Sequence, residues 1–181
     1  MIGSLAHSLR AGLTEGRGDY LFSECVVAER RIILAVPSTY MNESGVAVAQ
    51  LCEHFSLSPS GLVIVYDDFQ LPLGMLRIRA EGSDGGHHGL ASVIEHLQTE
   101  NIPRLRVGIA GATCPSEDRK ELMASYVLSP FEEDEVKLAA KLTDHAGDAL
   151  MAFIQHGIQF AMTNFNKAYP TAGSETGELR K

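Results

Sequence analysis

The chain has 181 residues, of which 45% are hydrophobic and 21% charged, so it is typical of one globular domain and unlike a disordered, collagen-like or coiled-coil protein. Its formal net charge of -8 excludes a polybasic nucleic-acid binder, so any RNA contact must come from a local basic patch. Three cysteines without a C-x-x-C pair exclude a disulfide framework and a zinc ribbon, and the lack of a long apolar run indicates a soluble, cytosolic protein.

The first half of the chain alternates helical and β-type patterns. Ile2, Leu5, Leu9 and Leu13 recur at helical spacing, which predicts that the chain opens with an amphipathic helix. The next predicted elements are a hairpin over 21–28 and 31–36, a helix over 44–56 and a buried strand over 62–66.

The second half continues in the order strand, helix, strand. The predicted elements are a strand over 75–79, a helix over 89–97, a strand over 105–110, a long helix and a short helix over 159–166. The sequence Ser129-Pro130-Phe131-Glu132 has the form of a capping box and predicts that the long helix begins here and runs to about Ile154. We therefore expect a single α/β domain over 1–167, with a mixed β-sheet flanked by helices, and a flexible tail over 168–181.

Three polar residues next to predicted elements have two interpretations each. Asn42 precedes a helix and either caps it or uses its amide to grip a peptide or nucleotide. Tyr40 either packs into the core or offers a ring for stacking on a base. Asp67 follows the buried strand and either bonds to the backbone or holds a histidine in one tautomer.

The segment 82–89 contains four glycines before a helix N-terminus, which favours a place for an anion. It is neither a P-loop nor a dinucleotide-binding fingerprint. His87 and His88 are sequence neighbours without further ligand spacing, so we expect no metal site.

Four arginines lie on or beside two neighbouring strands. Arg77, Arg79, Arg104 and Arg106 are either paired surface charges or a site for phosphate. No G-x-S-x-G motif is present, which excludes a serine mechanism of the α/β-hydrolase type.

Four ordered motifs resemble bacterial-type peptidyl-tRNA hydrolase. They are residues 37–45 (PSTYMNESG), 65–74 (VYDDFQLPLG), 82–90 (GSDGGHHGL) and 104–109 (RLRVGI). The resemblance extends from Leu5 to Asn166. It implies a compact, monomeric α/β enzyme that cleaves the ester between a peptide and the 3′-terminal ribose of tRNA, with peptidyl-tRNA as its partner and no metal or organic cofactor.

The resemblance also implies roles for individual residues. Tyr40 and Asn42 look like the substrate-contacting aromatic and asparagine of the family, and Asp67 looks like the carboxylate that orients its catalytic histidine. Arg79 and Arg106 resemble the residues that clamp tRNA phosphates.

The glycine-rich motif departs from the family pattern at one position. The family has an asparagine where this chain has His88, which donates a hydrogen bond but lacks the paired donor and acceptor of an amide. Gly86 and His87 match the motif and are expected to contact the substrate.

The larger departure is at the start of the chain. The family begins with a central strand, a glycine-rich loop and a segment that supplies the catalytic histidine, and this sequence contains none of them. We therefore expect the first central strand to be missing, an apolar groove with unpaired strand edges, and a low melting temperature.

Three hypotheses follow for a chain that retains Asp67 and Asn42 without that histidine. The first is an ordinary hydrolase whose start is misplaced. The second is a non-catalytic tRNA-binding relative that uses the same groove. The third is a hydrolase in which His87 or His88 replaces the base.

Overall fold

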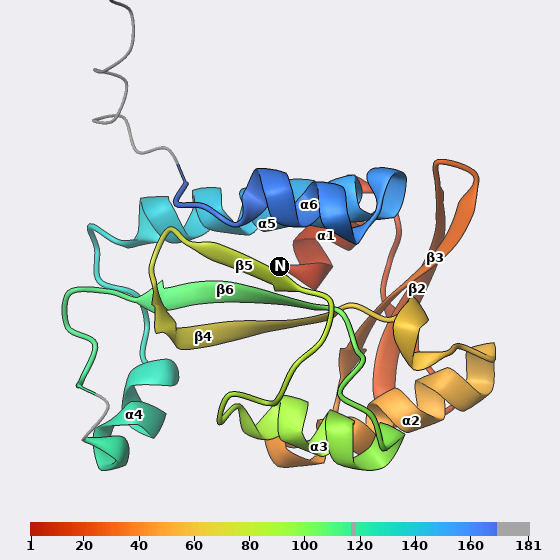
Figure 1. Ribbon diagram of the computed structural model, residues 1–181, viewed down its shortest axis with the longest axis horizontal. Coiled ribbons are helices and arrows are strands. Elements are labelled where there is room, and N and C mark those ends of the chain that lie inside the picture. The colour runs from red at the N-terminus through yellow and green to blue at the C-terminus, as the bar shows by residue number, and fades with distance from the viewer. Residues whose placement is uncertain (117–118, 170–181) are drawn as a thin grey trace, which may run out of the picture.

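The computed structural model describes residues 1–116 and 119–169, and its strands form two three-stranded sheets (Figure 1). The first sheet is antiparallel and contains, in order, β1 (Thr14–Glu15), β2 (Tyr20–Val27) and β3 (Arg30–Pro37). The second contains, in order, β4 (Ile64–Pro72), β6 (Arg104–Ala110) and β5 (Leu76–Arg79). In the second sheet β4 is parallel to β6 and β5 is antiparallel to it. The mixed α/β architecture is confirmed, with the strands divided between two sheets.

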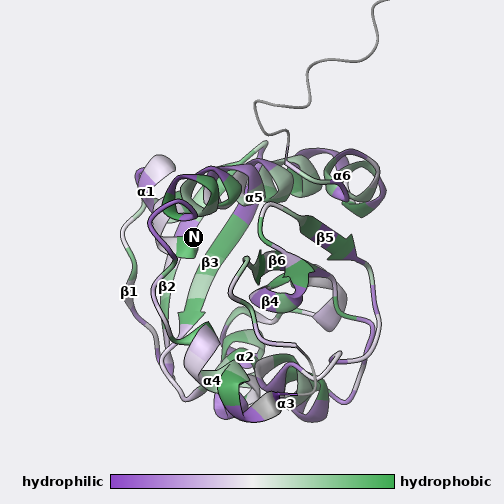
Figure 2. Cartoon of the chain, turned by 90° about the vertical axis from the view of Figure 1, so that its left-hand side faces the viewer, coloured by the Kyte–Doolittle hydropathy of each residue, from purple (hydrophilic) through white to green (hydrophobic). Residues whose placement is uncertain are grey.

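Helices cover both faces of the two sheets (Figure 2). One layer contains α1 (Ile2–Ser8), α5 (Val136–His156) and α6 (Ile158–Phe165), and the opposite layer contains α2 (Ser44–Phe55) and α3 (His88–Leu97). Short 3-10 helices, η1 (Met41–Glu43) and η2 (Pro59–Gly61), flank α2, and α4 (Lys120–Val127) follows β6. The largest core cluster lies under the α5 layer and includes the fully buried Leu76, Leu105 and Leu142.

The predicted hairpin is present and brings one face of β2 and β3 against α2. Ala28 and Glu29 form its turn with φ of 49° and 62°, the left-handed pair that suits a tight two-residue connection. Because side chains alternate along a strand, Tyr20 and Phe22 pack toward α2, whereas Leu34 faces the core under α5. The hairpin therefore contributes to two core clusters.

Two predicted helix boundaries are wrong. The first helix stops at Ser8, and Leu9 and Leu13 reach the core from the following irregular segment. The long helix begins at Val136, because the hydroxyl of Ser129 donates to the carbonyl of Tyr126 at 2.7 Å and forms no cap. The helix α4, whose last turn ends just before this serine, was not predicted.

β3 and β4 face each other across a groove of about 470 Å³, lined mainly by apolar side chains. Within the described residues, the edge of β3 away from β2 and the edge of β4 away from β6 pair with no strand. This agrees with the expected unpaired edges.

The described chain ends against β5. Ala168 forms a β-bridge with Met75, and the amide of Tyr169 donates to the carbonyl of Gly74 at 2.7 Å. These two residues are the first of the predicted tail, and the remainder, 170–181, lies outside the described residues. No helix in the described part of the chain is long and apolar enough to cross a membrane.

Candidate functional site

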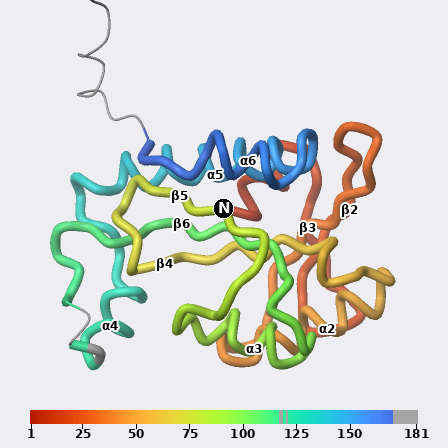
Figure 3. Tube along the Cα trace, viewed as in Figure 1, coloured from red at the N-terminus to blue at the C-terminus, as the bar shows by residue number. Residues whose placement is uncertain are grey.

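Two glycines bring segments that are distant in the sequence into contact, as the trace in Figure 3 shows for α2 and α3. A Cβ on Gly45 would lie 2.1 Å from the carbonyl oxygen of Ser92, and the Gly45 amide donates to the Ser92 hydroxyl at 3.0 Å. A Cβ on Gly89 would lie 2.5 Å from the sulfur of Met41. The N-terminus of α3 therefore packs directly on η1, which carries Asn42.

The glycine-rich loop before α3 ends in a histidine that caps the helix. Gly85 and Gly86 adopt φ of 59° and 83°, which an L side chain rarely adopts. His87 then accepts a hydrogen bond at Nδ1 from the amide of Leu90 at 3.1 Å. Its ring stacks on Tyr66 with 4.3 Å between the centroids. The loop therefore holds this imidazole in one orientation.

The surroundings of His87 favour its neutral form. Burial lowers the pKa of His87, and the charges of Asp67 and Asp68 oppose that shift only in part. Since Nδ1 accepts a hydrogen bond, the single proton of the neutral ring is on Nε2. His87 is therefore a hydrogen-bond donor through Nε2. Its other nitrogen, Nδ1, could accept a proton but already accepts the hydrogen bond from Leu90.

Asp67 and His87 both line the groove between β3 and β4. Asp67 is partly buried in β4, beside Val107 of β6, so the predicted position after the strand is wrong: the strand continues to Pro72. The hydroxyl of Thr39 lines the same groove, is buried, and has no hydrogen-bond partner among the described residues. A buried hydroxyl without a partner is uncommon in folded proteins.

Tyr40 and Asn42 are free to contact a ligand. The Tyr40 residue is 81% exposed, so the packing interpretation is wrong. Asn42 is exposed within η1, and α2 begins after Glu43 without a side-chain cap, so the capping interpretation is wrong as well. Both side chains lie on the segment that packs against the start of α3.

The four arginines share one face of the second sheet but differ in their partners. Arg104 is 2% exposed and donates to the carbonyls of Gly82, Ser83, Glu100 and Ile102. It holds the base of the glycine-rich loop, so the phosphate interpretation is wrong for this residue.

The other members of this face are more accessible. Arg106 forms an ion pair with Asp68, whose other carboxylate oxygen accepts from the amide of Gln70 at 2.8 Å. Arg79 is exposed at the end of β5, beside Arg104 on β6. Arg79 is thus the accessible positive charge next to the loop.

The remaining predicted contacts lie around the mouth of the same loop. His88 is exposed at the first position of α3, and Gly86 is exposed immediately before His87. In the described chain, no group of three or more histidine, cysteine or acidic side chains is placed to hold a metal ion. The site contains the carboxylate of Asp67, the amide of Asn42, the imidazoles of His87 and His88, aromatic rings and arginines.

Two residues of the site were not predicted individually. Tyr66 supports the His87 ring, and its position immediately before Asp67 was the only signal in the sequence. Thr39 became notable only through the groove, because its unpartnered hydroxyl depends on the tertiary arrangement.

Comparison with known proteins assigns the chain to one family. A family model described as peptidyl-tRNA hydrolase matches residues 1–173. The peptidyl-tRNA hydrolase of Persephonella marina is 38% identical over 170 residues, which cover 92% of this chain and 87% of that protein. That of Aquifex aeolicus is 43% identical over 141 residues, covering 78% and 71%. The crystal structure of the Acinetobacter baumannii peptidyl-tRNA hydrolase superposes with a TM-score of 0.84 at 26% identity, covering 94% of this chain and 84% of that one. The chain belongs to the peptidyl-tRNA hydrolase family.

Proposed function

We propose that this chain hydrolyses the ester bond between a peptide and tRNA at the β4–α3 site, releasing free tRNA for translation. The observation that supports it best is the contact between Gly89 and Met41. Met41 lines the groove together with Asp67 and His87, and the exposed Asn42 follows it directly in η1. Membership of the family supplies the substrate class. As the resemblance implies, we expect the enzyme to act as a monomer.

The proposed reaction is general-base attack of water on the ester carbonyl. The water oxygen bonds to the carbonyl carbon while the base takes its proton, and the bond from that carbon to the ribose oxygen then breaks. The proton passes to the ribose oxygen as it leaves. Asp67 orients the base, and Asn42 grips the peptide through its amide.

The remaining residues bind the two ends of the substrate. Tyr40 offers its exposed ring to the acceptor end, and Arg79 neutralises phosphates. Arg106 is paired with Asp68, so it contacts a phosphate only by sharing its guanidinium with that carboxylate. Gly86 and His87 contact the ester from the loop, with the Nε2 proton of His87 as donor. His88 stands where the family has an asparagine, and it donates a hydrogen bond to the substrate without the acceptor that an amide would add.

The base is proposed to be carried by a strand that occupies the β3–β4 groove. In the described part of the chain, two facing strand edges have no partner and the hydroxyl of Thr39 is unsatisfied, and with the apolar lining these observations support an extended occupant at this position. Asp67 lines the groove and would contact a histidine near the end of that strand. The intact mass of the protein purified from its own cells tests this: a mass above 19.6 kDa, with an added segment containing a histidine, is expected. A mass of 19.6 kDa counts against it.

Binding of tRNA without cleavage is the second candidate, and one observation favours it. The Nδ1 of His87 is occupied by the Leu90 amide, so this imidazole is poorly placed to act as the base. A chain of 181 residues acting alone would then bind through Arg79 and Tyr40 but leave the ester intact.

One pair of assays separates the two candidates and tests the surrogate-base hypothesis. Cleavage of an N-acetylated aminoacyl-tRNA and its equilibrium binding are measured for the 181-residue chain and for the variants Asp67→Asn, His87→Ala and His88→Ala. Cleavage that Asp67→Asn abolishes without loss of binding supports the hydrolase. Binding without cleavage in all four proteins, and also in the protein purified from its own cells, supports the second candidate. Cleavage by the protein from its own cells, with none by the 181-residue chain, supports a base carried by the added strand. Unchanged cleavage in both histidine variants shows that neither His87 nor His88 is the base.

A further inference from the structure

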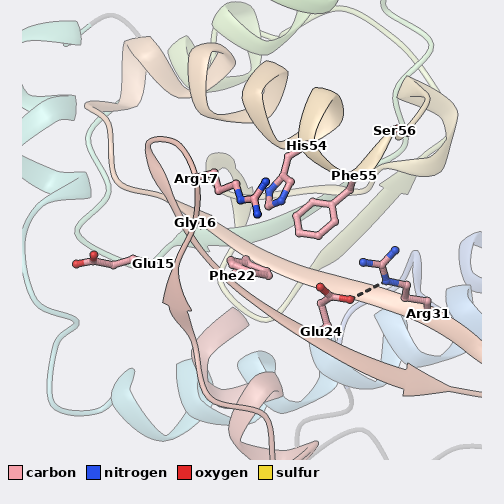
Figure 4. A pocket seen from close by; sticks show the side chains of 9 residues that line it. All are labelled: Glu15, Gly16, Arg17, Phe22, Glu24, Arg31, His54, Phe55 and Ser56. Carbon is pink, nitrogen blue, oxygen red and sulfur yellow. Dashed lines mark hydrogen bonds and ion pairs between the residues drawn. The ribbon is translucent and has the colours of Figure 1, made fainter.

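A second cavity lies on the hairpin and the C-terminal end of α2, away from the site described above. It has a volume of about 560 Å³, and neither Asp67, His87 nor Asn42 lines it. The side chains that form it come from β2, β3, the end of α2 and the segment before β2 (Figure 4). Its lining residues are Glu15, Gly16, Arg17, Phe22, Glu24, Arg31, His54, Phe55 and Ser56.

One wall of this cavity is aromatic. The ring centroids of Phe22 and Phe55 are 5.3 Å apart, and those of His54 and Phe55 are 4.2 Å apart with an interplanar angle of 31°. Phe22 stands at an angle to the other two rings, 57° to Phe55 and 73° to His54. Flat faces of this kind stack on the π-face of any base.

A partly buried hydrogen bond fixes the histidine of that wall. The hydroxyl of Tyr20, a residue only 2% exposed, lies 2.7 Å from Nδ1 of His54. When Tyr20 donates this bond, the ring proton is on Nε2, the nitrogen left free for a ligand. His54 then adds a directed donor to the stacking surface.

The segment before β2 is held so that it presents Arg17 to the cavity. A Cβ on Gly16 would lie 2.2 Å from the ring of Tyr20, and one on Gly18 would lie 2.4 Å from the amide oxygen of Gln50. Asp19 also exchanges two hydrogen bonds with the Gln50 side chain, at 2.7 and 3.0 Å. In Figure 4 the Arg17 side chain points toward His54.

The charges at the cavity leave Arg17 as its available cation. Arg31 pairs with Glu24 at 2.6 Å and lies over the Phe55 ring at 5.4 Å from its centroid. Arg17 has no ion-pair partner among the described residues, and the side chain of Glu15 points away from the cavity in Figure 4. In a protein of net charge -8, an exposed guanidinium beside aromatic rings is a local site for an anion attached to a flat ring.

We propose that this cavity binds an unpaired nucleotide, with its base stacked on the His54–Phe55 ring pair, Phe22 edge-on to that base, and its phosphate on Arg17. The rings supply the stacking, and the guanidinium supplies two parallel donors for phosphate oxygens. The nucleotide is either free or part of single-stranded RNA, since both present the same chemistry. A base stacked within a duplex cannot enter. The proposal does not depend on ester hydrolysis at the β4–α3 site.

The test uses the 181-residue chain with three probes: adenosine monophosphate, a single-stranded RNA trinucleotide containing 2-aminopurine, and the same trinucleotide sequence within a blunt duplex. Affinity is measured by calorimetry for the first probe and by 2-aminopurine quenching for the others. We expect saturable binding of at least one unpaired probe that depends on Arg17. Binding of the duplex, which the tRNA site also attracts through Arg79, is expected not to depend on Arg17. Arg17→Ala and Phe55→Leu are each expected to weaken binding of the unpaired probe about tenfold.

Lys141→Ala, an exposed change on α5, is the matched control and is expected to bind as the parent chain does. Arg17 is exposed, so its variant remains informative if Phe55→Leu fails to fold. Binding of the mononucleotide alone identifies a free nucleotide as the ligand, and binding of the trinucleotide alone identifies RNA. Affinity for the unpaired probes unchanged by Arg17→Ala, duplex binding that Arg17→Ala weakens equally, or no binding of either unpaired probe overturns the proposal.

Discussion

The Nδ1 of His87 accepts the amide proton of Leu90, so the histidine that enters the candidate site also caps the helix behind it. Protonation of the ring would remove this acceptor. The stability of the fold is therefore coupled to the charge of a residue at the site.

The free energy of unfolding is expected to depend on pH through His87. Because burial lowers the pKa of His87 in the folded protein, the unfolded chain binds a proton first as the pH falls. The contribution of neutral His87 to stability is complete above its pKa in the unfolded chain, about 6.5, and is lost as the pH falls through its lower pKa in the folded protein. Urea unfolding at several pH values is expected to show a smaller free energy of unfolding in acid.

The variant His87→Asn isolates this effect, because asparagine caps a helix without titrating. We expect a weaker pH dependence in the variant. Burial also lowers the pKa of His145, but this residue is present in both proteins, so its effect on the pH dependence cancels in the comparison. Identical pH profiles would show that the cap is not the titrating contact.

The second prediction concerns the contact between α2 and α3. Gly45→Ala places a methyl group 2.1 Å from the carbonyl oxygen of Ser92, so the helices must separate. We expect a loss of about 1–3 kcal/mol in the free energy of unfolding and weaker substrate binding, because η1 moves with α2.

Gly147→Ala is the matched control within α5, where the nearest atom to the new Cβ is Leu5 Cδ1 at 3.9 Å. This change is expected to raise stability by about 0.5–1 kcal/mol through helix propensity. Denaturant unfolding of both variants and of the parent chain measures these changes in the free energy of unfolding. A Gly45→Ala protein as stable as the parent would contradict the packing described for α2 and α3.

The third prediction separates two arginines that the sequence placed in one group. Arg79→Ala removes an exposed charge, so it is expected to weaken tRNA binding and leave stability unchanged. The negative slope of log affinity against log salt concentration is expected to become less steep by about one. Arg104→Ala leaves the carbonyls of Gly82 and Ser83 without their donor and is expected to lower the melting temperature.

Affinity titrations at several salt concentrations, together with thermal unfolding, distinguish the two roles. Arg104→Lys keeps the charge but lacks the planar set of donors, so it is expected to destabilise as well. If lysine restored full stability, charge rather than hydrogen-bond geometry would be the function of this position.

Local signals in the sequence were enough to predict the hairpin, α2 and α3, because each has a regular apolar period and a clear turn or helix end. They failed where a distant partner decides the outcome. Ser129 bonds back to Tyr126 at the end of α4 instead of capping the next helix, and Arg104 is buried by carbonyls of a loop more than twenty residues away. The motif around Asp67 was visible in the sequence, whereas the tautomer of His87 depends on the geometry of the α3 N-terminus.

The fourth prediction concerns the groove between β3 and β4. Two strand edges that are unpaired among residues 1–116 and 119–169, together with an exposed apolar lining, lower the cooperativity of unfolding and offer a surface to hydrophobic dyes. We expect the 181-residue chain to bind an anilinonaphthalene dye at neutral pH and to unfold at a low temperature. The protein purified from its own cells is the comparison: if a strand fills its groove, it binds less dye and melts higher. A cooperative, high-temperature transition without dye binding in the 181-residue chain would contradict the exposed groove.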